Sequence, residues 1–116
     1  MDGSPANRHQ PVIPLPDRSP VALRAAVAQL DPAALAKFEA DWTAATARAR
    51  DEYSLLPARH FVEHWWSWVA VERWPDMAAR LRAWEKIVAE SDDHAARRAA
   101  AAEIGSILRE AGTATE

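Results

Sequence analysis

Apolar residues recur every three or four positions over most of this chain, a spacing typical of amphipathic α-helices. The first two stretches have their apolar positions at Leu23, Ala26, Val27 and Leu30, and at Leu35, Phe38, Trp42, Ala45 and Ala49. Each follows a helix-start signal, because Ser19-Pro20 and Asp31-Pro32 pair a capping side chain with a proline suited to the first helical position. The pattern predicts a short helix over 20–30 and a longer one over 32–53.

A third helix begins, in this pattern, at Pro57 and is unusually rich in tryptophan. The run Leu55-Leu56-Pro57 interrupts the preceding helix, since the residue before a proline disfavours helical angles. Four tryptophans then fall within ten residues, at Trp65, Trp66, Trp68 and Trp74. The apolar stripe around them is broad, which predicts a central helix in contact with several neighbours.

Two more helices complete the predicted set. Trp74-Pro75 stops or kinks the tryptophan-rich helix, and the apolar spacing resumes over a fourth helix at about 76–89. Ser91-Asp92-Asp93 then offers an N-cap to a last helix that ends at Gly112. The first half of this helix has no large apolar residue, so we expect it to be the least firmly attached.

These elements predict the all-α fold class, because no strand alternation or hairpin turn occurs between Pro20 and Gly112. We expect a small antiparallel bundle of four to five helices, with the second, third and fourth forming its compact part. The bundle is a single helical domain over 19–112. Five of the eight prolines lie in the first twenty residues, which lack an apolar period, so residues 1–18 are expected to form a disordered proline-rich arm.

Composition narrows the classes of protein. The chain has no cysteine, which excludes disulfides and thiolate metal sites, and its net charge of -3 gives no basic surface for nucleic acid. No apolar run reaches the ~20 residues that span a bilayer, and the N-terminal residues lack the apolar core of a signal peptide. We therefore expect a cytoplasmic protein that binds neither a membrane nor, directly, nucleic acid.

One catalytic motif is present in the tryptophan-rich helix. His60, Glu63 and His64 match H-x-x-E-H, the spacing by which some zinc peptidases present two histidine ligands and a glutamate base. Glu103 is a conceivable third ligand. Two histidines on the polar face of a helix are more often plain solvated residues, so we expect no cofactor and no catalytic residue. A metal-dependent hydrolase is the alternative.

Tryptophans away from the centre of an apolar stripe are candidates for a partner surface. Trp65, Trp68, Trp42 and Trp84 lie mid-stripe and are predicted to be core residues. Trp66 lies at the edge of its stripe and Trp74 beside a helix break. We predict that the partner-binding residues are Trp66, Trp74, Ile104, Ile107 and Leu108.

Several packing motifs lie between Leu30 and Glu90. They are Phe38-Glu39 followed by Trp42, the spacing Arg50-x-x-Tyr53 at the end of the second predicted helix, the block Phe61–Ala70 with its V-x-x-W-W core, the segment Arg80–Arg82, and Ala83-Trp84-Glu85-Lys86-Ile87. In these motifs the chain resembles a family of small actinobacterial proteins that carries only a domain-of-unknown-function label. Members of that family look like genes often found beside RelE-type toxins, so the resemblance implies an antitoxin-like or accessory role.

Taken together, we expect a non-catalytic helical module that binds another protein, with neutralisation of a small basic toxin as its most specific form. A homo-oligomer is a further alternative, because the terminal helix can pair with its copy in a second chain.

Overall fold

The computed structural model describes residues 10–113, and this part of the chain contains five α-helices and no strand. The predicted all-α class is therefore confirmed. The chain divides into two compact units: a three-helix unit at 15–69, and a hairpin unit whose described residues are 10–14 and 70–113. No helix within 10–113 is both long enough and apolar enough to cross a membrane.

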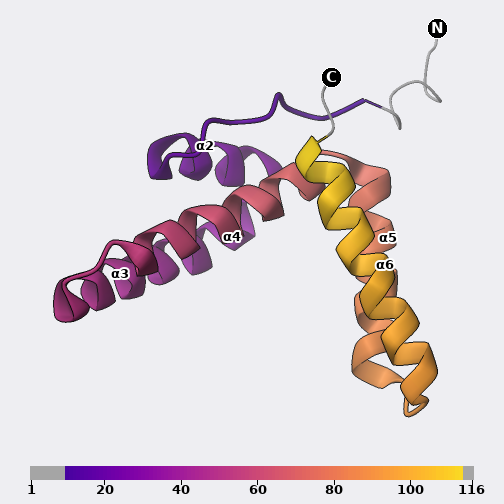
Figure 1. The fold of residues 1–116 in the computed structure, drawn as a ribbon. Helices are drawn as coiled ribbons and strands as arrows, with labels where there is room; N and C mark the ends of the chain where they lie inside the picture. Colours follow the sequence, from indigo (N-terminus) through magenta and orange to yellow (C-terminus); the bar gives the residue numbers. More distant parts are fainter. Residues whose placement is uncertain (1–9, 114–116) are drawn as a thin grey trace, which may run out of the picture. The chain divides into compact units, whose positions relative to one another are not determined.

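The first helix of the three-helix unit is α2, Pro20–Leu30 (Figure 1). Its start follows from the sequence, because the Ser19 hydroxyl accepts a hydrogen bond from the backbone N–H of Ala22 at 3.2 Å. Asp31 ends α2 and caps the next turn, with its carboxylate accepting from the N–H of Ala33 at 3.2 Å. That turn is a short 3-10 helix, η1, at Pro32–Ala34.

Helices α3, Leu35–Glu52, and α4, Leu56–Glu72, pack together through aromatic rings. The Phe38 ring of α3 lies 5.0 Å from that of Phe61 and 5.2 Å from that of Trp65, both on α4, in edge-to-face arrangements. All three side chains are buried. Such pairs contribute about 0.5–1.5 kcal/mol each beyond the burial of their area, so this cluster fixes how α3 lies against α4.

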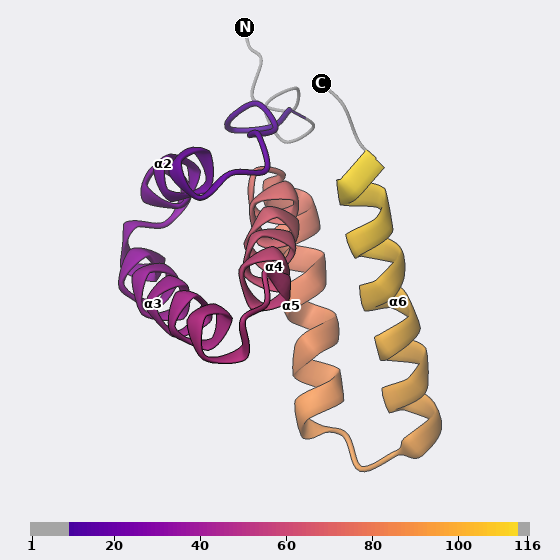
Figure 2. The same cartoon turned by 60° about the vertical axis from the view of Figure 1, so that its left-hand side comes forward.

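The hairpin unit is built on α5, Pro75–Glu90, and α6, His94–Thr113, which lie side by side (Figure 2). Asp93 starts α6, because its carboxylate accepts from the N–H of Ala95 at 3.0 Å. The prediction of a weakly attached last helix was wrong: Ala100, Ile107 and Ala111 are all fully buried. Small side chains let two helices approach closely, so Ala100 is buried although the first half of the helix has no large apolar residue.

The segment before α2 is structured from residue 10 onward. In the hairpin unit, the N–H of Val12 donates to the carbonyl of Arg73 at 2.7 Å, and the Arg73 guanidinium donates to the carbonyl of Ile13 at 3.3 Å. Ile13 itself is only 8% exposed. The prediction of a disordered arm over 1–18 is therefore wrong for 10–18, because an apolar anchor and main-chain hydrogen bonds hold it. Its remainder, 1–9, lies outside the described residues.

Candidate functional site

The tryptophans serve mainly to pack this protein. Trp65 and Trp66 are 2% and 6% exposed, whereas Trp42, Trp68, Trp74 and Trp84 are half-buried. The Trp65 indole N–H donates to the Asp41 carboxylate at 3.2 Å, and the Trp66 indole N–H donates to the carbonyl of Pro16 at 3.1 Å. Both buried donors on α4 are thus satisfied inside the three-helix unit, as burial of an indole requires.

The structure separates the five residues predicted to contact a partner. Trp66 and Ile107 are buried, Trp74 and Ile104 are half-buried, and Leu108 is 40% exposed. Trp66 is covered from one side by the Arg18 guanidinium, which lies 3.9 Å from the centre of a Trp66 ring. The helical period of α4 could not reveal this cover, because it comes from a segment about fifty positions earlier in the chain. Trp66 and Ile107 are therefore packing residues, and the surface predicted on the hairpin unit is reduced to Trp74, Ile104 and Leu108.

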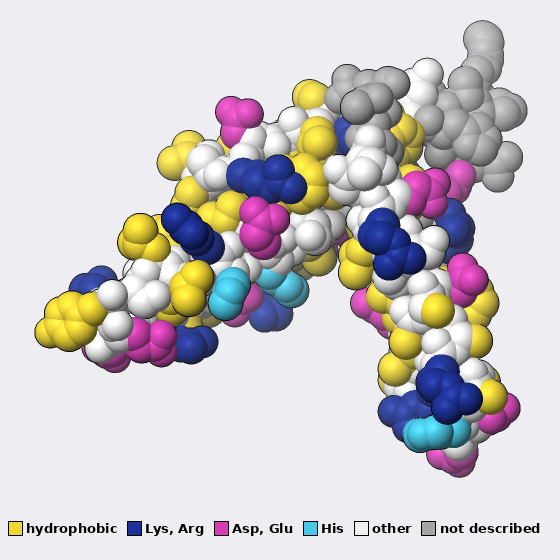
Figure 3. Space-filling view, in the orientation of Figure 1, with side chains coloured by type: hydrophobic (Ala, Val, Ile, Leu, Met, Phe, Trp, Pro, Cys, Tyr) yellow, Lys and Arg dark blue, Asp and Glu magenta, His cyan; other side chains and the backbone are white. Residues whose placement is uncertain are grey.

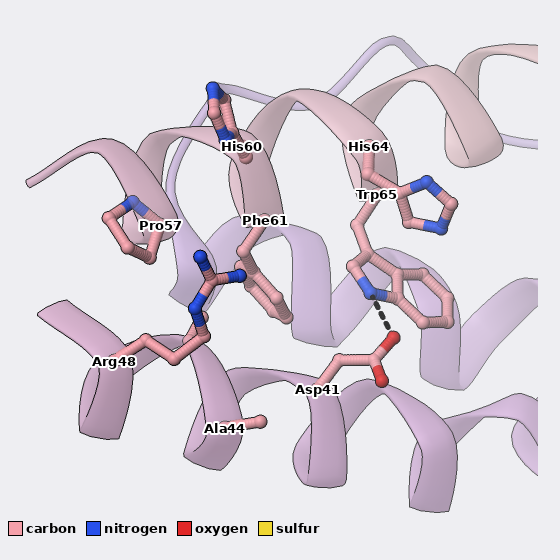
Figure 4. A pocket seen from close by; sticks show the side chains of 9 residues that line it. Asp41, Ala44, Arg48, Pro57, His60, Phe61, His64 and Trp65 are labelled. Carbon is pink, nitrogen blue, oxygen red and sulfur yellow. Dashed lines mark hydrogen bonds between the residues drawn. The ribbon is translucent and has the colours of Figure 1, made fainter.

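His60 and His64 border a hollow of about 260 Å³ between α3 and α4 (Figure 4). The rings of Phe61 and Trp65 point toward α3, whereas the His60 ring points away from it (Figure 4). Both histidines are exposed, and Glu63 forms an ion pair with Arg18 at 3.2 Å. Among residues 10–113, no group of three or more histidine and acidic side chains lies close enough to hold a metal ion.

The turn between α3 and α4 carries the largest exposed apolar side chains of the three-helix unit. Tyr53 is 97% exposed, Leu55 70% and Leu56 55%. Figure 3 shows hydrophobic side chains gathered at this end of α3 and α4, with charged ones around them. Single exposed apolar residues are common on proteins, but a contiguous group of large ones is typical of a binding surface.

Tyr53 holds an unusual backbone conformation. Its φ and ψ of 50° and 45° lie in the left-handed region, and it is the one non-glycine residue with positive φ in the described chain. The N–H of Ser54 donates to the carbonyl of Ala49 at 3.0 Å, the pattern by which a left-handed residue ends a helix. Glycine is the usual residue there because it has no Cβ to clash. The Ser54 hydroxyl then accepts from the N–H of Leu56 at 3.1 Å, at the start of α4.

An apolar groove of about 530 Å³ lies beside this turn, within the size range of ligand pockets. Its lining consists of the apolar residues Pro20, Trp42, Leu55, Ala58 and Val62, with Arg18, Arg59 and Glu63 as the charged ones. Leu55 also lines a second hollow of about 290 Å³, together with Arg50 and Tyr53. The two hollows therefore share an exposed leucine. We call this continuous region the corner surface: the lining of both hollows together with Leu56.

The sequence analysis did not predict the corner surface, although the residues around the turn contain a signal for it. Tyr53 continues the apolar stripe of α3, and the run Leu55-Leu56-Pro57 by itself indicates only a helix break. Three large apolar residues across a break that lacks a glycine indicate an exposed and strained turn, and that combination could have identified it.

Comparison with known proteins gives one result on the family. No match was found among the curated proteins, and none among the solved structures. The model of a family of unknown function, DUF6247, matches residues 11–112, which is most of the chain. This match confirms one part of the resemblance inferred from the packing motifs, namely that the chain belongs to a small family of unknown function. The chain belongs to the DUF6247 family.

Proposed function

We propose that this chain is a non-catalytic protein-interaction module and that its partner binds at the corner surface. The observation that carries the proposal is Tyr53, whose ring is 97% exposed while its backbone occupies the left-handed region. A non-glycine residue there costs roughly 1–2 kcal/mol. An exposed ring recovers little of that cost through packing inside the chain, so a role in contact with another molecule accounts for it.

The neighbours of Tyr53 support the same assignment. Leu55 and Leu56 extend the exposed apolar area, and the groove beside them offers a concave apolar floor next to a convex aromatic side chain. Aromatic residues are enriched at the centres of protein interfaces, because they supply a large contact area with few rotatable bonds. The corner surface thus has the composition of an interface centre with a charged rim.

The most specific form of the proposal is an antitoxin-like partner of a small basic toxin. It is supported by the resemblance to proteins encoded beside RelE-type toxins and by the net charge of -3, which favours encounter with a basic protein.

A pull-down of the tagged full chain from its native host, with mass spectrometric identification, tests the proposal. We expect one stoichiometric protein to co-purify with the wild type and to be lost from a Tyr53→Ala/Leu55→Ser variant. Leu108→Ser is the matched control, because Leu108 is an exposed apolar residue of the hairpin unit. Loss on the Leu108 change instead would move the interface to α6. A partner that neither change affects, or a bait that purifies alone, would contradict the proposed surface.

Self-association through the hairpin unit is a second candidate, favoured by one observation. Four large apolar residues along α5 are only half-buried: Met77, Leu81, Trp84 and Val88. A second hairpin packed against them would complete a four-helix bundle. Light scattering tests self-association, because a molecular mass that stays monomeric at high protein concentration would exclude it.

A further inference from the structure

We infer that the corner surface recognises an amphipathic segment of its partner, in which large apolar side chains are flanked by aspartate or glutamate. This inference rests on the proposed function and specifies the chemistry of the partner at the same site. It follows from which charges around the two hollows are already neutralised and which are not.

The rim of the larger groove contains one compensated pair and one uncompensated cation. Arg18 and Glu63 form an ion pair at 3.2 Å, and Arg18 also stacks on Trp66. The side chain of Arg59 forms no hydrogen bond or ion pair with any residue that the structure describes. The groove therefore presents one guanidinium group whose charge is available to a ligand.

The smaller hollow, which Leu55 also lines, has a second arginine on its rim. It is lined by Ala49, Arg50, Tyr53, Ser54 and Leu55. The Arg50 side chain likewise has no hydrogen-bond or ion-pair partner among residues 10–113. The nearby acidic residues do not neutralise it: Glu52 binds Arg48 at 3.2 Å, and Asp51 lines neither hollow.

The exposed Leu55 thus lines both hollows, and each hollow also has an arginine whose side chain is without a hydrogen-bond or ion-pair partner among residues 10–113. Guanidinium binds carboxylate with two parallel hydrogen bonds, and this geometry selects Asp and Glu side chains. The apolar floor of Trp42, Ala58 and Val62 selects large apolar side chains. A segment that satisfies both requirements has an apolar stripe with acidic residues beside it, the usual form of a helix that docks in a groove. The two arginines bind only acidic residues of the docked segment, so the partner as a whole can carry either net charge.

Selection from a phage-displayed library of random peptides against the full chain tests this inference. The wild type is expected to enrich peptides that combine Leu, Phe or Trp with neighbouring Asp or Glu. An Arg50→Glu/Arg59→Glu variant is expected to enrich Lys and Arg at those positions instead and to bind the original peptides roughly tenfold more weakly. Leu55→Ser is expected to lose them. These side chains are exposed, and neither arginine side chain forms a hydrogen bond or ion pair with residues 10–113. An unchanged melting midpoint verifies that each variant is folded.

The control is Arg97→Glu/Arg98→Glu, which reverses two exposed arginines on α6 and is expected to select the same peptides as the wild type. Three results would overturn the inference: identical peptides for all variants, no acidic enrichment, or binding that survives Leu55→Ser. A dimer in sedimentation experiments that Leu55→Ser abolishes would also overturn it, because a second copy would then occupy the surface.

The host partner separates this inference from the proposed function. A partner that is lost from Leu55→Ser but retained by Arg50→Glu/Arg59→Glu contradicts acidic recognition and leaves the proposed function intact. A partner retained by both variants contradicts the proposed function itself.

Discussion

Replacement of Tyr53 by glycine is expected to stabilise the protein while weakening its binding to the partner. The change acts on the backbone: at φ 50° and ψ 45° the Cβ of tyrosine crowds the following carbonyl, and glycine has no Cβ. The ring contributes almost nothing to the core, because it is 97% exposed. Stability and function are therefore predicted to change in opposite directions at this single position.

The magnitude follows from two opposing terms. Relief of the left-handed conformation is worth roughly 1–2 kcal/mol, and the extra freedom of glycine in the unfolded chain removes about 0.4–1 kcal/mol of that gain. At the centres of these two ranges, the net increase in the free energy of unfolding is about 0.8 kcal/mol. For a chain of this size, that corresponds to a rise in the melting midpoint of roughly 2–6 °C.

Urea unfolding followed by tryptophan fluorescence measures this difference, and Tyr53→Ala is the matched control. Alanine removes the same ring but keeps the Cβ, so its stability is expected to stay close to that of the wild type. Both variants are expected to weaken partner binding, because both lack the ring. The reasoning is refuted if Tyr53→Gly is no more stable than Tyr53→Ala, since the backbone would then store no strain.

Three further predictions concern packing. Ile13→Ala is expected to lower the free energy of unfolding by roughly 1–3 kcal/mol, because Ile13 is only 8% exposed; an unchanged urea midpoint would show that the segment before α2 is not anchored. Gly105→Ala in the interior of α6 is expected to add about 0.5–1 kcal/mol, provided that the Arg109 guanidinium, 3.3 Å from the new Cβ, moves aside; calorimetry showing a lower midpoint would mean that it does not. Trp66→Phe keeps an aromatic ring but removes the donor to the Pro16 carbonyl, so about 1 kcal/mol of stability should be lost in urea titration, and no loss would indicate that water replaces the bond without cost.

The helices could be predicted because the signals that start and end them are local. Ser19 and Pro20 define the start of α2 within four residues, and Pro75 begins α5 directly after Trp74. The packing of those helices could be predicted only where a large side chain marks it. The alanines of α6 carry no such mark, since the closeness of two helices depends on the surface of the partner helix as well.

The candidate site was harder to predict, because its features depend on residues that are distant in sequence. Trp66 looked like a surface residue from the period of α4, and it is the Pro16 carbonyl and the Arg18 guanidinium that cover it. Whether Arg50 and Arg59 have ion-pair partners likewise depends on where other side chains lie in the fold. A sequence shows arginines next to acidic residues, but only the structure shows that Glu52 binds Arg48 and that Arg50 has no ion-pair partner among residues 10–113.

The contrast between the tryptophans and Tyr53 indicates where binding energy is available. The indoles of Trp65 and Trp66 are buried with their N–H groups bonded to Asp41 and Pro16, so their area already stabilises the fold. A partner that used them would first have to remove those contacts. Tyr53 and Leu55 are 97% and 70% exposed, so a partner that covers them gains most of the hydrophobic contribution of their area. In this chain the richest aromatic cluster therefore stabilises the fold, and the exposed turn beside it is where a partner gains most.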